Sequence, residues 1–342
     1  MVRGIVRISA EELTQVLGHY DIGVIHQTRR LSGGSRHAAK LVIISDRGQY
    51  LLKRRPKSKE DLYHVAFSHA IQNHLAGKSF PVATILTTTD EHNTILCSND
   101  HIYELFEFVR GVRYDGSAEA TADAGRQLAN LHQNMADFDF ESAPMKGSFH
   151  DSSTIRQHLK TACTAGSDKA NKELRDTAVM LMDLYNGASV RVNTLGFDSW
   201  SQQVIHGDWH QGNMLFAGRK LVAVLDFDSA KIAPPVTDLA NGMLQFSIVG
   251  SRPNPVDWPG YLDQAKLVLF INGYREVIKL DEKRLLALPD LMMETMIAEA
   301  ILPIAATGFF GHLSGAAFLK MIHRKTAWIE ENKKALLKAI TG

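Results

Sequence analysis

Hydrophobic positions change their spacing along the chain near Gly111. Before this residue, short apolar runs bounded by turn residues are typical of β-strands. One turn is Asp46-Arg47-Gly48, where glycine can take a positive φ. The pattern predicts strands over residues 23–30, 38–45, 49–54, 82–86 and 101–109.

Helical patterns open the chain and dominate its later part. Ser9 to Glu12 has the form of a capping box, in which a hydroxyl and a carboxylate satisfy free backbone amides, so a short helix is expected there. Apolar spacing predicts a second helix from Asp61 to Leu75, stopped by Pro81. Beyond Gly111, spacings of three and four predict helices, interrupted by strands at residues 203–205, 214–216 and 221–225. Everything after Asp238 is predicted to be helical.

This segregation of strands and helices predicts an α+β fold with two lobes. Residues 1–109 are expected to form a β-rich lobe, and residues 110–342 a mainly helical one.

Composition excludes several classes of protein. The formal net charge is +1, from 38 Lys+Arg and 37 Asp+Glu, whereas nucleic-acid binders usually carry a clear basic excess. The two cysteines, Cys97 and Cys163, have no metal or redox spacing, which favours a reducing compartment. No secretory signal or membrane span is recognised, because residues 1–10 lack a long apolar core and residues 297–310 are too short. We expect a cytoplasmic protein that binds neither nucleic acid nor membranes; the sequence leaves the oligomeric state open.

The residues best suited to catalysis lie in two neighbouring segments. Val204 to Asn213 and Val222 to Asp228 consist of short apolar strands that end in polar residues. This order predicts that Asp208, Asn213 and Asp226 lie at one end of a small sheet. Phosphoryl transfer needs such a set: one carboxylate to orient the attacking hydroxyl, and oxygen ligands for Mg²⁺. A zinc site at His206 and His210 is disfavoured, because that spacing needs a helix and Gly207 follows a strand.

The same segments resemble a known family. The pattern His-Gly-Asp-x-His-x-x-Asn occurs at residues 206–213, and Asp-Phe-Asp at residues 226–228. It is similar to the catalytic loop and metal-binding strand of the aminoglycoside phosphotransferase/choline kinase/type II homoserine kinase superfamily. The resemblance implies a two-lobed, protein-kinase-like fold, with Asp208 as catalytic base and Asn213 and Asp226 as Mg²⁺ ligands. It also implies a secondary role for Asp228 and a bracing role for Asp238.

The resemblance implies nucleotide contacts in the first lobe. Gly33, Gly34 and Ser35 lie between the first two predicted strands, where kinases place a glycine-rich loop, although a plain hairpin turn would look alike. Lys53 has the position of the phosphate-binding lysine, or is an exposed strand lysine. Backbone groups from Glu107 to Val109 resemble the hinge that hydrogen-bonds adenine, although an ordinary strand leading into a turn would look alike.

The chain departs from the pattern in one respect. Kinases pair the third-strand lysine with a glutamate on the next helix, but the predicted helix has no carboxylate between Ala66 and His74. Glu60 and Asp61, at the start of this helix, remain as alternative partners, or the lysine is held by another group. Trp209 is unusual in the loop, and we expect its indole to pack beneath the loop rather than to line the acceptor site.

Together these features predict an ATP- and Mg²⁺-dependent phosphotransferase that acts on a hydroxyl of a small molecule. An amino alcohol, a hydroxy amino acid, a sugar and an aminoglycoside all remain open as acceptors. A Ser/Thr protein kinase and a nucleotide-binding scaffold without catalysis are the alternatives. Glu294 and Glu299 would suit a cationic acceptor, although solvated or ion-paired surface carboxylates are the commoner explanation.

Overall fold

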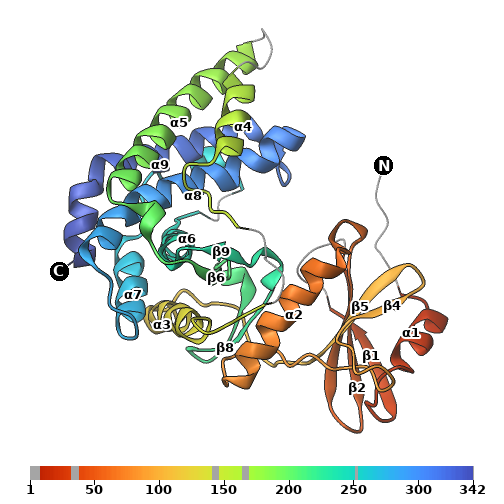
Figure 1. Ribbon diagram of the computed structural model, residues 1–342. Coiled ribbons are helices and arrows are strands. Elements are labelled where there is room, and N and C mark those ends of the chain that lie inside the picture. Colours follow the sequence, from red (N-terminus) through yellow and green to blue (C-terminus); the bar gives the residue numbers. More distant parts are fainter. Residues whose placement is uncertain (1–7, 32–37, 141–145, 164–168, 251–252, 342) are drawn as a thin grey trace. The chain divides into compact units, whose positions relative to one another are not determined.

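The structure is a computed structural model that describes residues 8–31, 38–140, 146–163, 169–250 and 253–341. Its contacts divide the chain into two compact units (Figure 1). The first unit comprises Met1–Arg113, Asp137–Pro144 and Met214–Ser229. The second comprises Tyr114–Ala136, Met145–Asn213 and Ala230–Gly342. The lobe boundary near residue 110 stays a prediction.

An antiparallel sheet forms the centre of the first unit, in the order β1-β2-β3-β5-β4. Four of its strands confirm predicted segments: β1 (Ile25–Arg30), β2 (Ala39–Ser45), β3 (Gln49–Arg54) and β5 (His101–Glu107). The edge strand β4 (Leu96–Ser98) was not predicted. It is only three residues long, too short for a periodic signal.

Two helices cover the sheet of this unit. Helix α1 (Ala10–Leu17) has the predicted capping box, and its apolar residues pack with Ile43, Leu52 and Leu105 on one face. Because side chains alternate across a strand, Lys53 and its register partner Glu104 point to the opposite face. Helix α2 (Leu62–Gly77) supplies His69 to that face, and the side chain of Asp61 caps its first turn.

The strand predicted over residues 82–86 is wrong. Val82 bridges Val224 whereas Ile85 bridges Phe106, so this segment changes partner within four residues and no ladder continues. The remaining elements of the first unit are a 3₁₀ turn, η1 (Lys57–Lys59), and the hairpin of β7 (Met214–Ala217) and β8 (Lys220–Val224), followed by the turn η4 (Phe227–Ser229).

Helices make up most of the second unit. They are α3 (Ala118–Asn134), α4 (Ser153–Cys163), α5 (Lys169–Thr194), α6 (Pro235–Ser247), α7 (Gln264–Arg275), α8 (Glu282–Thr307) and α9 (Gly315–Thr341), with the turns η2 (Phe197–Ser199), η3 (Gln211–Asn213) and η5 (Pro255–Asp257). The strands β6 (Gln203–Ile205) and β9 (Lys231–Ala233) pair antiparallel.

Two details of the second unit bear on the sequence predictions. The helical prediction after Asp238 is wrong at one place, where β10 (Phe309–Phe310) and β11 (Leu313–Ser314) form a small hairpin. Gly308 and Gly311 have positive φ there and turn the chain. Across the described ranges, no helix has the length and apolar character needed to span a bilayer.

Candidate active site

A buried carboxylate holds the polar loop that follows β6. Asp238 lies in the first turn of α6 and is 1% exposed. Its carboxylate oxygens accept hydrogen bonds from the backbone N–H of His206 (2.8 Å) and Gly207 (2.9 Å). Burial alone would raise the pKa of Asp238, but His132, His206 and the Gly207 amide hold it below its ordinary value. The expected bracing role of Asp238 is confirmed.

Asp208 is the next residue of this loop, and it is kept ionised. Its side chain is 38% exposed, and Oδ2 lies 3.0 Å from Nδ2 of Asn213 and 3.4 Å from Nε2 of His210. Burial would raise the pKa of Asp208, but His210, His206 and the hydrogen bond from Asn213 lower it below its ordinary value. His210 receives the Gly212 N–H at Nδ1, so its Nε2 carries the proton toward Asp208.

Asn213 ends the turn η3 and is buried. Its Nδ2 donates to both the backbone oxygen and the carboxylate of Asp208, so Oδ1 is the atom left for a cation. Trp209, between the two, is fully buried with its ring edge-on to His206, which confirms that the indole packs beneath the loop.

Lys53 in the first unit has a buried carboxylate partner, Glu104. Its ammonium lies 3.2 Å from Glu104 Oε2, and the two residues are register partners on β3 and β5. Arg55 contacts the same carboxylate at 2.9 Å, and His69 of α2 lies 2.7 Å from its other oxygen. Burial would raise the pKa of Glu104, but Lys53, His69 and Arg55 hold it far below its ordinary value.

This arrangement settles which residue stands opposite Lys53. Glu60 instead accepts from the Ile102 amide and faces His101, and Asp61 caps α2, so neither alternative partner is used. Sequence reasoning missed Glu104 because its only signal was a carboxylate between the apolar residues in the middle of a strand.

Asp226 and Asp228 follow β8 in the first unit. Asp226 is exposed and has φ of 63°, in the left-handed region that non-glycine residues seldom adopt. Asp228 accepts hydrogen bonds from Arg55 (2.9 Å) and Lys59 (3.1 Å). Burial would raise the pKa of Asp228, but Lys53, Arg55 and Lys59 lower it to about 2. The turn that carries Asp226 is therefore pinned by Asp228.

The predicted site residues are divided between the two units. Asp208 and Asn213 are in direct contact within the second unit, whereas Lys53 and Asp226 belong to the first. Gly33, Gly34 and Ser35 lie outside the described residues. At the predicted hinge, the Glu107 N–H donates to Thr84 and the Phe108 N–H to Gln49.

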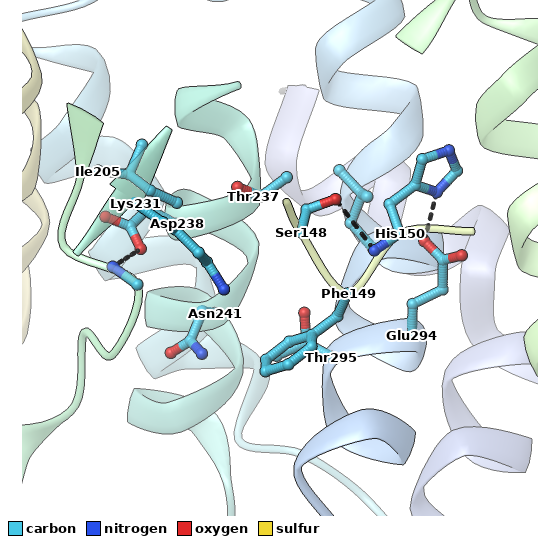
Figure 2. Close-up of a pocket in the computed structure, with 12 residues that line it drawn as sticks. Ser148, Phe149, His150, Ile205, Lys231, Thr237, Asp238, Asn241, Glu294 and Thr295 are labelled. Carbon is cyan, nitrogen blue, oxygen red and sulfur yellow. Dashed lines mark hydrogen bonds and ion pairs between the residues drawn. The ribbon is translucent and has the colours of Figure 1, made fainter. Parts of the chain in front are cut away.

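A pocket lies beside the Asp208 loop within the second unit (Figure 2). It is lined by β6, β9, α6, α8 and residues 148–150, and includes Gly207 next to Asp208. Glu294, in α8, is fully buried and pairs with His150, and Glu299 accepts from the side chains of Asn241 and Gln245. The expectation that these two glutamates are ordinary surface carboxylates is therefore wrong.

Comparisons with known proteins agree with this architecture. A family model described as phosphotransferase enzyme family matches residues 27–276. None of the curated proteins compared with the chain matches it.

Solved structures similar to the chain share its fold. An aminoglycoside phosphotransferase from Alicyclobacillus acidocaldarius has a TM-score of 0.69 at 16% identity, over 99% of this chain and 97% of that one. An amicoumacin kinase in complex with AMP-PNP and Ca²⁺ has a TM-score of 0.68 at 13% identity, over 94% of this chain and 93% of that one. A microcompartment-associated aminopropanol kinase has a TM-score of 0.68 at 16% identity, over 96% of this chain and 98% of that one. The kinase-like α+β fold class is thereby confirmed. Because the family model covers most of its length, the chain belongs to the phosphotransferase enzyme family.

Proposed function

We propose that the protein transfers the γ-phosphoryl group of ATP, in the presence of Mg²⁺, to a hydroxyl of a small molecule. The observation that carries this proposal is the partly exposed, ionised carboxylate of Asp208, oriented by Asn213 and His210. A carboxylate in this state accepts the hydrogen bond of an incoming hydroxyl and takes its proton as the oxygen attacks phosphorus.

The proposed metal ligands fit a hard cation. Asn213 Oδ1 and the Asp226 carboxylate supply oxygen, the donor atom that Mg²⁺ prefers. The Nδ2 of Asn213 is already used by Asp208, which orients the carbonyl oxygen. When bound, the metal would neutralise charge on the β- and γ-phosphates. Metal binding by the Asp226 carboxylate would also explain why this residue is held in a left-handed conformation.

Nucleotide binding is assigned to the first unit. Lys53 is positioned by Glu104 to reach phosphate oxygens, with Gly33, Gly34 and Ser35 as the proposed backbone contacts. For adenine, the N–H groups of Glu107 and Phe108 are taken, so we assign the carbonyl of Glu107 and the amide of Val109.

The pairing of Lys53 also bears on the scaffold alternative. A non-catalytic scaffold would be favoured if Lys53 lacked a carboxylate partner, but Glu104 on β5 pairs with it. A small-molecule acceptor is further supported by two of the similar structures, whose names describe kinases of aminopropanol and amicoumacin.

Thermal unfolding tests the nucleotide site. ATP, GTP and ADP would each be added with and without Mg²⁺ to the wild-type protein and to Asp226→Asn. The asparagine tolerates the left-handed backbone and removes only the charge. A ligand at one hundred times its dissociation constant stabilises the folded state by about 2.7 kcal/mol. We expect a Mg²⁺-dependent rise in Tm that weakens in the variant; no rise with any nucleotide would contradict the proposal.

Release of ADP in the presence of candidate acceptors tests the chemistry. Asp208→Ala is expected to bind Mg²⁺-nucleotide normally yet to lose about 10²-fold or more in kcat. Turnover at the wild-type rate in this variant would remove Asp208 as the base.

A further inference from the structure

The pocket beside Asp208 is partly open to solvent, and the space free of protein atoms that it encloses, open solvent included, is about 350 Å³. Its position next to Gly207 makes it the candidate acceptor pocket, so the choice of ligand for this pocket rests on the proposed function.

Two of the acidic groups that line this pocket are already satisfied by the protein. Asp238 accepts from two loop amides. Glu294 receives His150 at 2.8 Å, the Ser189 hydroxyl at 2.5 Å and the Asp151 amide at 3.3 Å. Because their oxygens are occupied, neither offers a strong contact to a cationic acceptor.

Lys231 presents a cation to the same pocket. It lies on β9, and its ammonium is 4.6 Å from the centre of the Phe149 ring. Among the residues that the structure describes, no carboxylate lies within ion-pair distance of it. Burial lowers the pKa of Lys231, and the more distant charges of Asp238, Glu299 and Asp208 only oppose this shift. A half-buried ammonium without an ion-pair partner is less well stabilised than one in water, so an anionic ligand would be favourable here.

Asn241 presents an unused acceptor. It is 4% exposed, and its Nδ2 donates to Glu299 at 2.7 Å, which fixes the orientation of the amide. Oδ1 is buried and has no hydrogen-bond partner in the described part of the chain. Figure 2 draws both Asn241 and Lys231 in the lining of this one pocket. The pocket therefore contains a cation without a matching anion and a hydrogen-bond acceptor without an N–H or O–H donor.

We propose that this pocket binds a small hydroxy acid, whose carboxylate pairs with Lys231 and whose amino or hydroxyl group donates to Asn241 Oδ1. The hydroxyl to be phosphorylated then lies toward Asp208, beside the Gly207 wall of the pocket. One unpaired ammonium balances the single charge of a carboxylate rather than the nearly double charge of a phosphate monoester. Among the acceptors that the sequence leaves open, this proposal favours those with a carboxylate over amino alcohols, which carry only a positive charge.

Matched pairs of compounds test the proposal, each pair differing at the carboxylate: L-serine and ethanolamine, L-homoserine and 3-amino-1-propanol, glycerate and glycerol. Thermal unfolding with each compound at millimolar concentration measures binding without nucleotide. We expect at least one acid to raise Tm well above its uncharged or decarboxylated counterpart, and the same acid to stimulate ADP release. If no acid raises Tm more than its counterpart, the proposal is overturned.

Variants of Lys231 identify the group responsible. Lys231→Met should weaken binding of the acid about thirtyfold or more, because one partner of a buried charge pair is lost. Lys231→Arg should retain most of it, and Lys283→Met, an exposed lysine on α8, should leave it unchanged. An acid that binds Lys231→Met as tightly as wild type overturns the assignment. The rise in Tm caused by Mg²⁺-nucleotide is measured in the same proteins. If wild type shows no such rise, the proposed function itself is contradicted. If wild type shows the rise but no acid binds, only the proposal for the acceptor pocket fails.

Discussion

Single residues carry charges that the fold has to balance, and Glu104 is the clearest case. Its carboxylate is fully buried and meets three basic side chains, Lys53, Arg55 and His69. Removing one partner of such a cluster leaves uncompensated buried charge, which is far more costly than losing a surface ion pair. Glu104 thus links the stability of the first unit to the position of the proposed phosphate-binding lysine.

Replacing this carboxylate should be costly. Glu104→Gln is expected to lower the free energy of unfolding by about 3–5 kcal/mol, since Lys53 and Arg55 lose their shared counter-charge. Glu107→Gln, an exposed residue on the same strand, should change it by less than about 0.5 kcal/mol. Urea unfolding of both variants measures the difference. Equal stabilities would show that the buried cluster contributes nothing to the fold.

Glu299 should make the free energy of unfolding depend on pH, with a sign opposite to the effect of an ordinary ion-paired carboxylate. Burial, acting against the Asn241 hydrogen bond and together with the charge of Asp208, raises the pKa of Glu299 from 4.5 to about 7. Between these values the folded protein holds a proton that the unfolded chain releases. The free energy of unfolding therefore falls as pH rises through this window, by at most about 3 kcal/mol.

The corresponding measurement compares slopes rather than absolute stabilities. Glu299→Gln cannot titrate, so its stability should fall less between pH 5 and pH 8 than that of wild type. Glu282→Gln, an exposed glutamate on the same helix, should retain the wild-type slope. Parallel curves for wild type and Glu299→Gln would contradict the raised pKa.

The candidate site was predictable to the extent that its residues are adjacent in the chain. Asp208 and Asn213 lie five residues apart, and their contact follows from one short loop. Glu104 lies far from Lys53 in sequence, and their pairing depends on the register of β3 against β5. No local pattern could have selected it over Glu60 or Asp61.

Whole elements are positioned by close backbone approach where α3 crosses α7. A Cβ atom built on Gly125 would overlap the carbonyl oxygen of Phe270, and one on Gly273 would overlap that of Ala122. Glycine is normally unfavourable within a helix by about 1 kcal/mol relative to alanine. Here the absence of a side chain lets the two helices approach closely.

Alanine substitution separates these two effects. Gly125→Ala should destabilise the protein by about 2 kcal/mol or more, since neither backbone can move without disturbing the packing. Gly77→Ala, at the end of α2 with open space around it, should be neutral or stabilising by up to about 1 kcal/mol. Unfolding in urea compares the two; a stabilising Gly125→Ala would mean that the two helices do not pack in close contact at this crossing.

Over the whole molecule, the first unit includes a segment that is distant in the chain. Residues 214–229 contribute Asp228, which contacts Arg55 and Lys59, and Val224, whose amide bonds to Pro81. A fragment of residues 1–113 would leave these groups without their partners.

We expect residues 1–113 alone to unfold without a cooperative transition. The same fragment joined to residues 214–229 by a short glycine-serine linker should recover a sharper transition, because Asp228 restores the ion pairs of Arg55. Circular dichroism during heating distinguishes them. Equal, cooperative unfolding of both fragments would show that the distant segment is dispensable.

Local features of this protein could be predicted from its sequence: the capping box at Ser9, most strands of the first sheet, and the loop that presents Asp208. These depend on residues close together in the chain, where spacing and turn chemistry suffice. By contrast, the contact of Glu104 with Lys53, and the shared pocket of Lys231 and Asn241, became visible only in the folded chain. Such pairings depend on strand register and helix packing between segments far apart in the sequence, which no local pattern encodes.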